Sequence, residues 1–154
     1  MNRDRIFTDL FAFEAKVLKD GNEVVYDDRT GKAAHGVGIL TVGYGRNLQG
    51  RGLTEEEARF LFKNDVEEAV IYAKRLLSVA AWEAMGDVRR EVLVQMVFQM
   101  GFHGVRLFRR MLAALERNDY STAAAEMVDS AWYRDPRTNE RAHTLKSWML
   151  AGTR

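Results

Sequence analysis

Residues 13–45 read FEAKVLKDGNEVVYDDRTGKAAHGVGILTVGYG, and this stretch marks a change from a helical pattern to a small β-region. Before it, apolar residues recur at helical spacing across residues 3–18, which predicts an N-terminal helix with Glu14 near its apolar face. Asp20-Gly21-Asn22 then supplies the residues of a tight turn. The helix should therefore end just before this turn.

The rest of the opening stretch favours strands joined by tight turns. Residues 23–26 and 38–44 are rich in β-branched and aromatic side chains, as strands are. Most of the 12 glycines of the chain lie between positions 21 and 52. That concentration predicts a compact β-region and little β-structure elsewhere.

From Thr54 onward the sequence is typical of helices. Thr54-Glu55-Glu56-Glu57 has the spacing of a capping box, and apolar residues continue its helix to Leu77. A second, nearly buried helix should begin at Asp87 and stop at Gly101. Three further helices are predicted over residues 105–115, 121–128 and 138–150.

These elements predict an α+β fold that is mostly α. We expect a single domain over residues 1–154, with a small β-hairpin lobe at about 19–53 and a long linking helix at about 54–77. A larger helical lobe should comprise about 78–154 and the N-terminal helix. A substrate would lie in the cleft between the lobes.

Composition excludes several kinds of function. The 154 residues contain no cysteine, which rules out disulfides, thiol catalysis and cysteine-based metal sites. The three histidines show no metal-ligand spacing, so neither metal nor cofactor is expected. A net charge of +1 argues against a dedicated nucleic-acid binder, although Arg106, Arg109 and Arg110 can touch an anionic polymer. No run is long enough for stable membrane insertion, and no secretory signal is expected.

Two carboxylates and a threonine follow one another in an order that suits glycoside hydrolysis. This reaction needs one carboxyl group to give a proton and one to assist a nucleophile. Glu14 lies between Phe13 and Val17, and an apolar helix face favours the protonated form of a carboxyl group. Asp28 lies on a wetter hairpin and should stay ionised, and Thr41 opens the strand Thr-Val-Gly-Tyr-Gly.

Several separate motifs resemble the phage lysozyme family of the T-even type, glycoside hydrolase family 24. The resemblance is ordered along the chain from about Leu10 to Gly152. The motifs are Gly45-Arg46-Asn47-Leu48, Leu53-Thr54-Glu55-Glu56-Glu57-Ala58, Asn64-Asp65-Val66, Val88-Arg89-Arg90, Met96-Val97-Phe98-Gln99-Met100-Gly101, Ser130-x-Trp132-Tyr133 and Pro136-x-x-Asn139-x-Arg141-Ala142.

This resemblance implies a muramidase that cleaves the β-1,4 bond between N-acetylmuramic acid and N-acetylglucosamine in peptidoglycan. It implies an inverting reaction in which Glu14 is the general acid, and Asp28 with Thr41 positions a water. Two departures from the family pattern lie beside this site. Ala15 follows Glu14 where the family usually has glycine, and Tyr26-x-Asp28 arrives later than in the family.

The resemblance also implies substrate-binding residues. Arg141 corresponds to an arginine that contacts the catalytic glutamate in the family. Gln99 would be a sugar-contacting amide or a satisfied core amide, and Tyr44 would border the sugar groove or pack in the sheet. Trp132 is expected to anchor the core, and Arg46 to pair with Asp65 in a structural contact.

Alternatives remain for the catalytic carboxylates. Asp20 takes the place of Glu14 if the chain carries no insertion at the Asp20 turn, and Glu23 is also close in sequence. Asp27 is the rival to Asp28, although the Tyr-x-Asp-x-x-Gly spacing favours Asp28. A second insertion near residues 32–40 separates Asp28 from Thr41.

The expected biological role is that of a phage or prophage endolysin. Its partners would be peptidoglycan glycan strands, and it would act as a monomer. It would wait in the host cytoplasm and reach the periplasm through a holin-dependent route. One alternative is a degenerate muramidase domain that binds peptidoglycan or a protein partner without cleavage, and another is a structural virion component.

Overall fold

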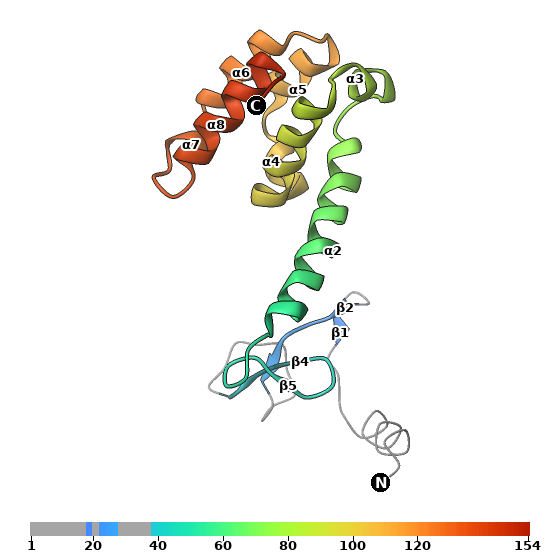
Figure 1. The fold of residues 1–154 in the computed structure, drawn as a ribbon, viewed down its shortest axis with the longest axis vertical. Coiled ribbons are helices and arrows are strands. Elements are labelled where there is room, and N and C mark those ends of the chain that lie inside the picture. The colour runs from blue at the N-terminus through green and yellow to red at the C-terminus, as the bar shows by residue number, and fades with distance from the viewer. Residues whose placement is uncertain (1–17, 20–21, 28–37) are drawn as a thin grey trace. The chain divides into compact units, whose positions relative to one another are not determined.

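The computed structural model describes residues 18–19, 22–27 and 38–154, and its elements are labelled in Figure 1. The chain divides into two compact units, Met1–Arg59 and Phe60–Arg154, which we call the sheet unit and the helical unit. Glu14, Asp20 and Asp28 lie outside the described residues.

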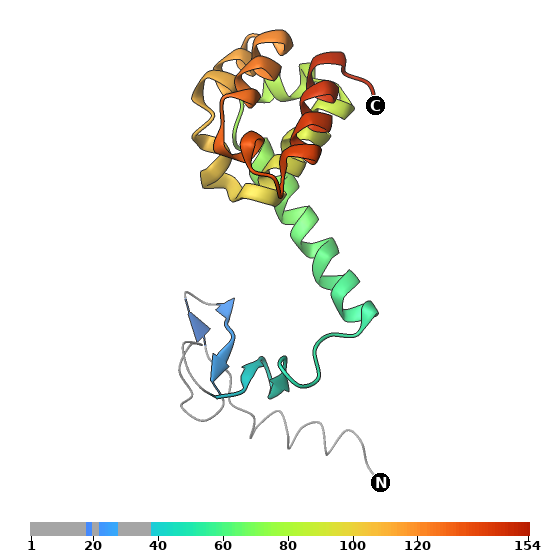
Figure 2. The same ribbon diagram turned by 90° about the vertical axis from the view of Figure 1, so that its left-hand side faces the viewer.

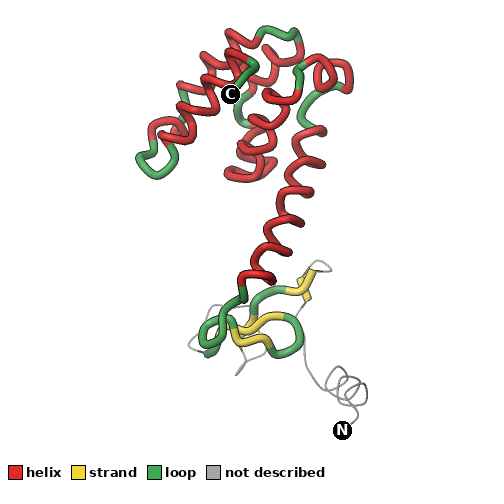
Figure 3. Tube along the Cα trace, viewed as in Figure 1, coloured by secondary structure: helices red, strands yellow, loops and turns green. Residues whose placement is uncertain are grey.

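All strands of the described chain belong to the sheet unit, where Figure 3 shows them in yellow. Two short antiparallel sheets form, a pair β1-β2 and a three-stranded sheet of order β3-β4-β5. Their bounds are β1 Leu18–Lys19, β2 Asn22–Glu23, β3 Tyr26–Asp27, β4 Leu40–Val42 and β5 Arg46–Asn47. Strand β4 is central, with Thr41 opposite Tyr26 on one side and Asn47 on the other.

The predicted β-region is present, but its boundaries differ. The strand expected over residues 38–44 is confirmed in its centre, as β4. The strand expected over residues 23–26 is instead shared between β2 and β3, which belong to different sheets. Leu18 was predicted to end a helix, and this is wrong, because it pairs with Glu23 in β1. Here hairpin pairing outweighs a helical periodicity that continues by chance into Leu18.

Helices make up most of the described chain after residue 54. They are α2 Glu55–Lys74, α3 Val79–Ala84, α4 Asp87–Arg106, α5 Arg109–Glu116, α6 Tyr120–Val128, α7 Ala131–Arg134 and α8 Asn139–Ala151. The predicted α+β class, mostly α and with a long helix after the β-region, is confirmed. The short helices α3 and α7 were not predicted. No helix in the described part of the chain is long and apolar enough to cross a membrane.

Helix α2 begins with the predicted capping box. The Thr54 hydroxyl accepts from the Glu57 amide at 3.2 Å, and the Glu57 carboxylate accepts from the Thr54 amide at 2.7 Å. Both bonds satisfy N–H groups that a helix start leaves unpaired. The helix ends at Lys74, slightly before the predicted Leu77.

Helix α4 is interrupted at Gly101, as predicted. Gly101 has φ 71° and ψ 166°, a conformation that a residue with a Cβ rarely adopts. The chain then resumes one more helical turn to Arg106. The single helix predicted over residues 105–115 is therefore wrong, because Phe108 takes the non-helical angles φ −78° and ψ 54° and α5 starts after it.

The core of the helical unit forms around α4. Figure 2 shows α8, in red, beside α4, and the two helices contact each other. Residues Val92, Leu93, Met96 and Val97 of α4 are buried, as the predicted broad apolar face required. Facing side chains complete this core from the later helices: Met111, Leu115, Ala123, Ala124, Met127, Leu145 and Met149.

Candidate active site

Thr41 is the predicted catalytic residue that the structure describes best. It lies at the centre of the three-stranded sheet and is only 4% exposed, the one buried polar residue in the described part of the chain. Its Oγ1 donates a hydrogen bond to the Ile39 carbonyl at 3.1 Å. A hydroxyl has one proton and two lone pairs, so Oγ1 keeps its capacity to accept. It can therefore accept a hydrogen bond from a water molecule.

The two predicted carboxylates of the site, Glu14 and Asp28, lie outside the described residues, as does the rival Asp20. The chain around Asp28 is nevertheless informative. Its predecessor Asp27 ends β3 and pairs with Leu40, the neighbour of Thr41. The described sheet thus brings the backbone that leads into Asp28 beside the strand that carries Thr41.

Tyr44 and Glu23 lie near the turn between β4 and β5. This turn contains Gly43 and Gly45 at φ 59° and 74°, and Tyr44 between them is 42% exposed. The exposure suits a residue that borders a groove. A Cβ on Gly43 would lie 3.1 Å from the Glu23 carboxylate, so this rival acid lies against the turn. Glu23 is exposed, in agreement with a position on a solvated strand face.

Arg46 braces the sheet unit and does not pair with Asp65, so that prediction is wrong. Its guanidinium forms two bonds to the Glu57 carboxylate, at 2.9 and 2.5 Å. Two more bonds reach the Gly52 carbonyl, at 2.9 and 2.6 Å. This geometry joins β5 to the first turn of α2 and leaves Arg46 a structural role.

The pKa of Glu57 lies below its usual value. The main cause is the hydrogen bond from the Thr54 amide, followed, against the opposing effect of burial, by the hydrogen bond from Arg46. Glu57 therefore stays ionised while it holds both the helix cap and the arginine. Its carboxylate is committed to structure.

Gln99 and Trp132 form one polar contact of the helical unit. The Trp132 indole N–H donates to Gln99 Oε1 at 2.9 Å, and the Trp132 side chain packs in the core, 8% exposed. Trp132 is therefore a core anchor, as predicted. The Gln99 amide is half-buried, and its Nε2 has no hydrogen-bond partner among the described residues. Gln99 thus accepts from the indole through Oε1 and can donate to another group through Nε2.

Arg141 makes a contact that the sequence did not suggest. Its Nη2 donates to Gln95 Oε1 at 3.2 Å, which joins α8 to α4. Gln95 and Gln99 are four residues apart on α4 and so share one helical face. Two predicted substrate-binding residues therefore meet this polar row of α4: Gln99 lies in it, and Arg141 of α8 contacts its other member, Gln95. The spacing of the two glutamines was the available clue.

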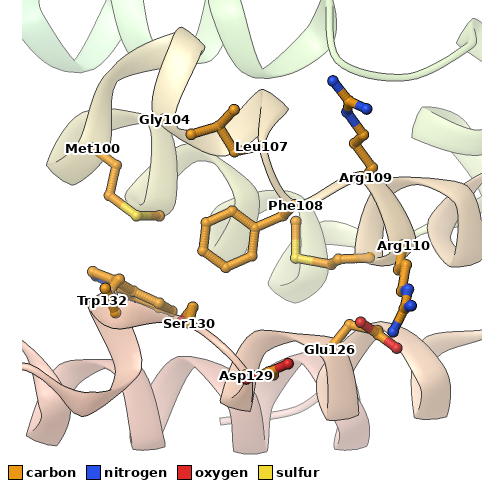
Figure 4. Close-up of a pocket in the computed structure, with 12 residues that line it drawn as sticks. Met100, Gly104, Leu107, Phe108, Arg109, Arg110, Glu126, Asp129, Ser130 and Trp132 are labelled. Atoms are coloured by element: carbon orange, nitrogen blue, oxygen red, sulfur yellow. The ribbon is translucent and has the colours of Figure 1, made fainter.

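A pocket of about 820 Å³ opens in the helical unit, shown in Figure 4. Met100, Phe108 and Trp132 form its apolar part, and the Phe108 and Trp132 rings meet edge to face at 6.3 Å. Arg110 and Glu126 add charge at its border. Among the described residues, no group of three or more histidine and acidic side chains is arranged to hold a metal.

A small antiparallel sheet with a buried threonine, followed by a long helix and an all-helical unit, defines a lysozyme-like α+β protein. A sequence model of the phage lysozyme family matches residues 22–147. The chain belongs to the phage lysozyme family.

Three relatives show how the chain compares with known proteins. The pre-baseplate central spike protein Gp5 of Enterobacteria phage T4 is 33% identical over 117 residues, which are 74% of this chain and 20% of that protein. The probable T4-type lysozyme 1 of Dictyostelium discoideum is 30% identical over 103 residues, 66% of this chain and 59% of the relative.

The probable T4-type lysozyme 2 of the same organism is 26% identical over 102 residues, again 66% of this chain and 59% of the relative. The chain thus spans between a fifth and three fifths of the length of the relatives it matches.

Proposed function

We propose that this protein is a muramidase that cleaves the β-1,4 bond between N-acetylmuramic acid and N-acetylglucosamine in peptidoglycan. The observation that carries the proposal is Thr41, a buried threonine whose hydroxyl proton is held by the Ile39 carbonyl at 3.1 Å. Membership of the phage lysozyme family supports it independently. The whole chain, residues 1–154, would act as one muramidase domain.

In the proposed mechanism Glu14 donates a proton to the leaving oxygen. Asp28 removes a proton from a water on the opposite face of the sugar, while that water donates its second hydrogen bond to Thr41 Oγ1. This requires Thr41 to accept, which agrees with the direction of its own bond to Ile39. An inverting reaction of this kind needs carboxyl groups roughly 6.5–9.5 Å apart.

Tyr44, Gln99 and Arg141 are proposed to bind the substrate. Tyr44 supports this role by its exposure on a glycine-flanked turn. Gln99 supports it because its amide nitrogen donates no hydrogen bond to a described residue. Arg141 would orient Glu14, and its bond to Gln95 would hold the guanidinium in place.

The proposed biological role is that of a phage or prophage endolysin acting on peptidoglycan glycan strands. The relatives named as T4-type lysozymes support the lysozyme activity, and the match to the phage lysozyme family supports the phage role. The protein would act as a monomer, be held in the host cytoplasm, and depend on a holin to reach the periplasmic wall.

The test compares wild type with Glu14→Gln and Asp28→Asn in turbidity assays on Gram-negative cells with permeabilised outer membranes. Loss of a general acid or base typically slows a reaction by about 10²–10⁴-fold. Asp27→Asn is the matched control, because it removes the adjacent carboxylate and should leave lysis unchanged. If Asp20→Asn or Glu23→Gln abolishes lysis while Glu14→Gln does not, the acid has been placed on the wrong residue.

The second candidate function is a degenerate domain that binds peptidoglycan without cleaving it. The observations that favour it are Ala15 after Glu14 and the longer spacing to Asp28. Purified sacculi separate the two candidates. A wild-type protein that pellets with sacculi and releases no soluble muropeptides would be a binding domain.

A further inference from the structure

A cationic surface with an exposed leucine lies between the break in α4 and the start of α5. We call it the Leu107 surface and define it by His103, Arg106, Leu107, Arg109 and Arg110. No acidic residue occurs between Glu91 and Glu116, so this surface carries no acid of its own segment. The proposed muramidase activity does not use it.

Leu107 is among the most exposed large apolar residues of the described chain, at 75%. Its neighbour Phe108 packs into the unit instead, with its ring edge to face with Trp132. Figure 4 shows Leu107 and Arg109 extending away from the Phe108 ring. The chain thus exposes Leu107 to solvent and packs the following residue, Phe108, against the core.

The arginines of this surface differ from most others in the described chain. Arg46, Arg90 and Arg137 each pair with a carboxylate. Arg106, Arg109 and Arg110 have no ion pair among the described residues. Arg106 only rests over the Phe102 ring, at 5.5 Å. None of these three guanidinium groups is neutralised by an ion pair with a described residue, so they remain able to bind an external anion.

The local backbone adds to the positive charge of these arginines. Arg109 and Arg110 are the first residues of α5, where the positive end of a helix dipole normally attracts acidic side chains. The first turn contains no acid, and no side chain caps it. Placing two cations there is unfavourable in isolation, and a bound anion would relieve the repulsion.

A hollow of about 400 Å³ lies on this surface, lined by His103, Gly104, Arg106, Leu107 and Arg109. None of these residues is acidic. Leu107, Arg109 and Arg110 of this surface also line the larger pocket, where Glu126 and Asp129 lie, but neither acid lines this hollow. The charge of its lining suits phosphate groups, which guanidinium groups bind with paired hydrogen bonds.

We propose that the Leu107 surface binds the headgroup layer of an anionic phospholipid bilayer. Guanidinium groups would contact lipid phosphates, and Leu107 would enter the layer below them. A nucleic acid offers the same phosphates but no apolar layer for an exposed leucine, which is why we commit to a lipid. The contact is peripheral, and it would keep the protein close to a membrane that borders the cell wall.

Vesicle sedimentation tests this proposal with the full-length protein at about 0.1 M salt. Wild type should pellet with phosphatidylglycerol-containing vesicles, remain in solution with pure phosphatidylcholine, and lose binding as salt rises. Each basic residue near an anionic bilayer contributes about 1 kcal/mol, roughly fivefold in binding. Arg106→Gln combined with Arg109→Gln should therefore weaken binding about 25-fold.

The matched control is Lys63→Gln combined with Lys74→Gln, which removes the same charge from exposed positions on α2. It should retain binding within about twofold, apart from the general loss of net charge. Leu107→Ser should weaken vesicle binding several-fold and leave any binding to short single-stranded DNA unchanged. Thermal melting of each variant establishes that it is folded.

Three results would overturn the proposal. Wild type could fail to bind anionic vesicles, the two double variants could lose binding equally, or Leu107→Ser could bind vesicles as tightly as wild type. Retained binding in the leucine variant would mean that phosphate alone is recognised. Hydrolysis of lipid-free sacculi is a separate readout, so a failure of the muramidase proposal would not be mistaken for a failure of this one.

Discussion

The sheet unit and the helical unit are each stabilised by a different kind of interaction. In the described part of the sheet unit only Tyr26 and Thr41 are buried. The helical unit instead encloses a continuous apolar core that includes Leu93, Met96 and Leu145. One unit therefore depends on directional polar bonds, and the other on removal of apolar surface from water.

This difference assigns separate tasks to the two units. The helical core supplies most of the free energy of folding that the described residues contribute. The sheet unit depends on the Arg46 contacts to Glu57 and Gly52, and it should open locally at a lower free energy. The region that carries Thr41 is thus the more easily perturbed one.

The largest expected effect is loss of core packing in the helical unit. Leu145 and Leu150 lie on the same helix, but Leu145 is 1% exposed and Leu150 is 51% exposed. Leu145→Ala should lower the free energy of unfolding by about 2–5 kcal/mol, because it leaves a cavity. Leu150→Ala should change it by about 0.5 kcal/mol or less. Urea denaturation at neutral pH measures both.

Equal losses from the two leucine variants would contradict this assignment. They would mean that the face of α8 that carries Leu145 does not pack against the core. If amide hydrogen exchange in the sheet unit of Leu145→Ala matches that of wild type, the two units are stabilised independently.

The next effect is on catalysis and concerns the sheet unit. Thr41→Val keeps the shape of the side chain and removes the hydroxyl, so the free energy of unfolding should fall by only about 1 kcal/mol. Loss of a group that positions the reacting water should slow muropeptide release roughly a hundredfold. Thr41→Ser keeps the hydroxyl and should keep most of the activity. Muropeptide release from sacculi provides the rate.

A valine variant with normal activity would remove Thr41 from the mechanism and leave it a purely structural residue. A serine variant as inactive as the valine variant would point to packing of the methyl group. Only the ordering wild type, serine, valine supports the proposed water contact.

Much of the helical structure was predictable because its information is local. The Thr54–Glu57 capping box fixed the start of α2, and the glycine at position 101 fixed the break in α4. The short helices α3 and α7 were missed, although Ser78 and Ser130 cap them. Such short helices owe their stability to tertiary contacts, which apolar spacing does not reveal.

The candidate site was less predictable because its contacts join distant residues. The bond from Trp132 to Gln99 spans 33 positions of sequence, so no local pattern indicates it. Arg46 was expected to pair with Asp65, and it pairs with Glu57 instead. The helix cap already holds the Glu57 carboxylate in one orientation, so a guanidinium can bind it without ordering it further.

The third prediction concerns this arginine and tests whether polar bonds hold the sheet unit. Arg46→Lys keeps the charge but cannot reproduce the fork that reaches Glu57 and Gly52 together. Amide exchange in β4 and β5 should become roughly three- to tenfold faster, with the helical core unchanged. Arg59→Lys is the control, because the Arg59–Glu55 pair is about three-quarters exposed on both sides. Faster exchange in both variants would mean that general charge effects are responsible.

The smallest expected effect is on the pH dependence of the two units. The pKa of Glu57 is lowered by its bonds from Thr54 and Arg46, and that of Asp135 is lowered to about 2 by bonds from the Arg137 side chain and amide. A carboxyl group with a lowered pKa stabilises the folded state above its unfolded pKa. That contribution disappears as the pH falls through the folded value.

The contribution of Glu57 should therefore be complete above pH 4.5, its ordinary value, and decline below it. That of Asp135 should be complete above pH 3.8 and decline as the pH falls from there towards about 2. Acidification from pH 5 should thus accelerate amide exchange in β5 and the first turn of α2 before it affects the turn at Asp135. Glu57→Gln should remove this early response, while Glu55→Gln should retain it. If amide exchange at the Asp135 turn accelerates first, the sheet unit is not the more acid-sensitive region. The difference between polar and apolar stabilisation would then not produce a difference in pH dependence.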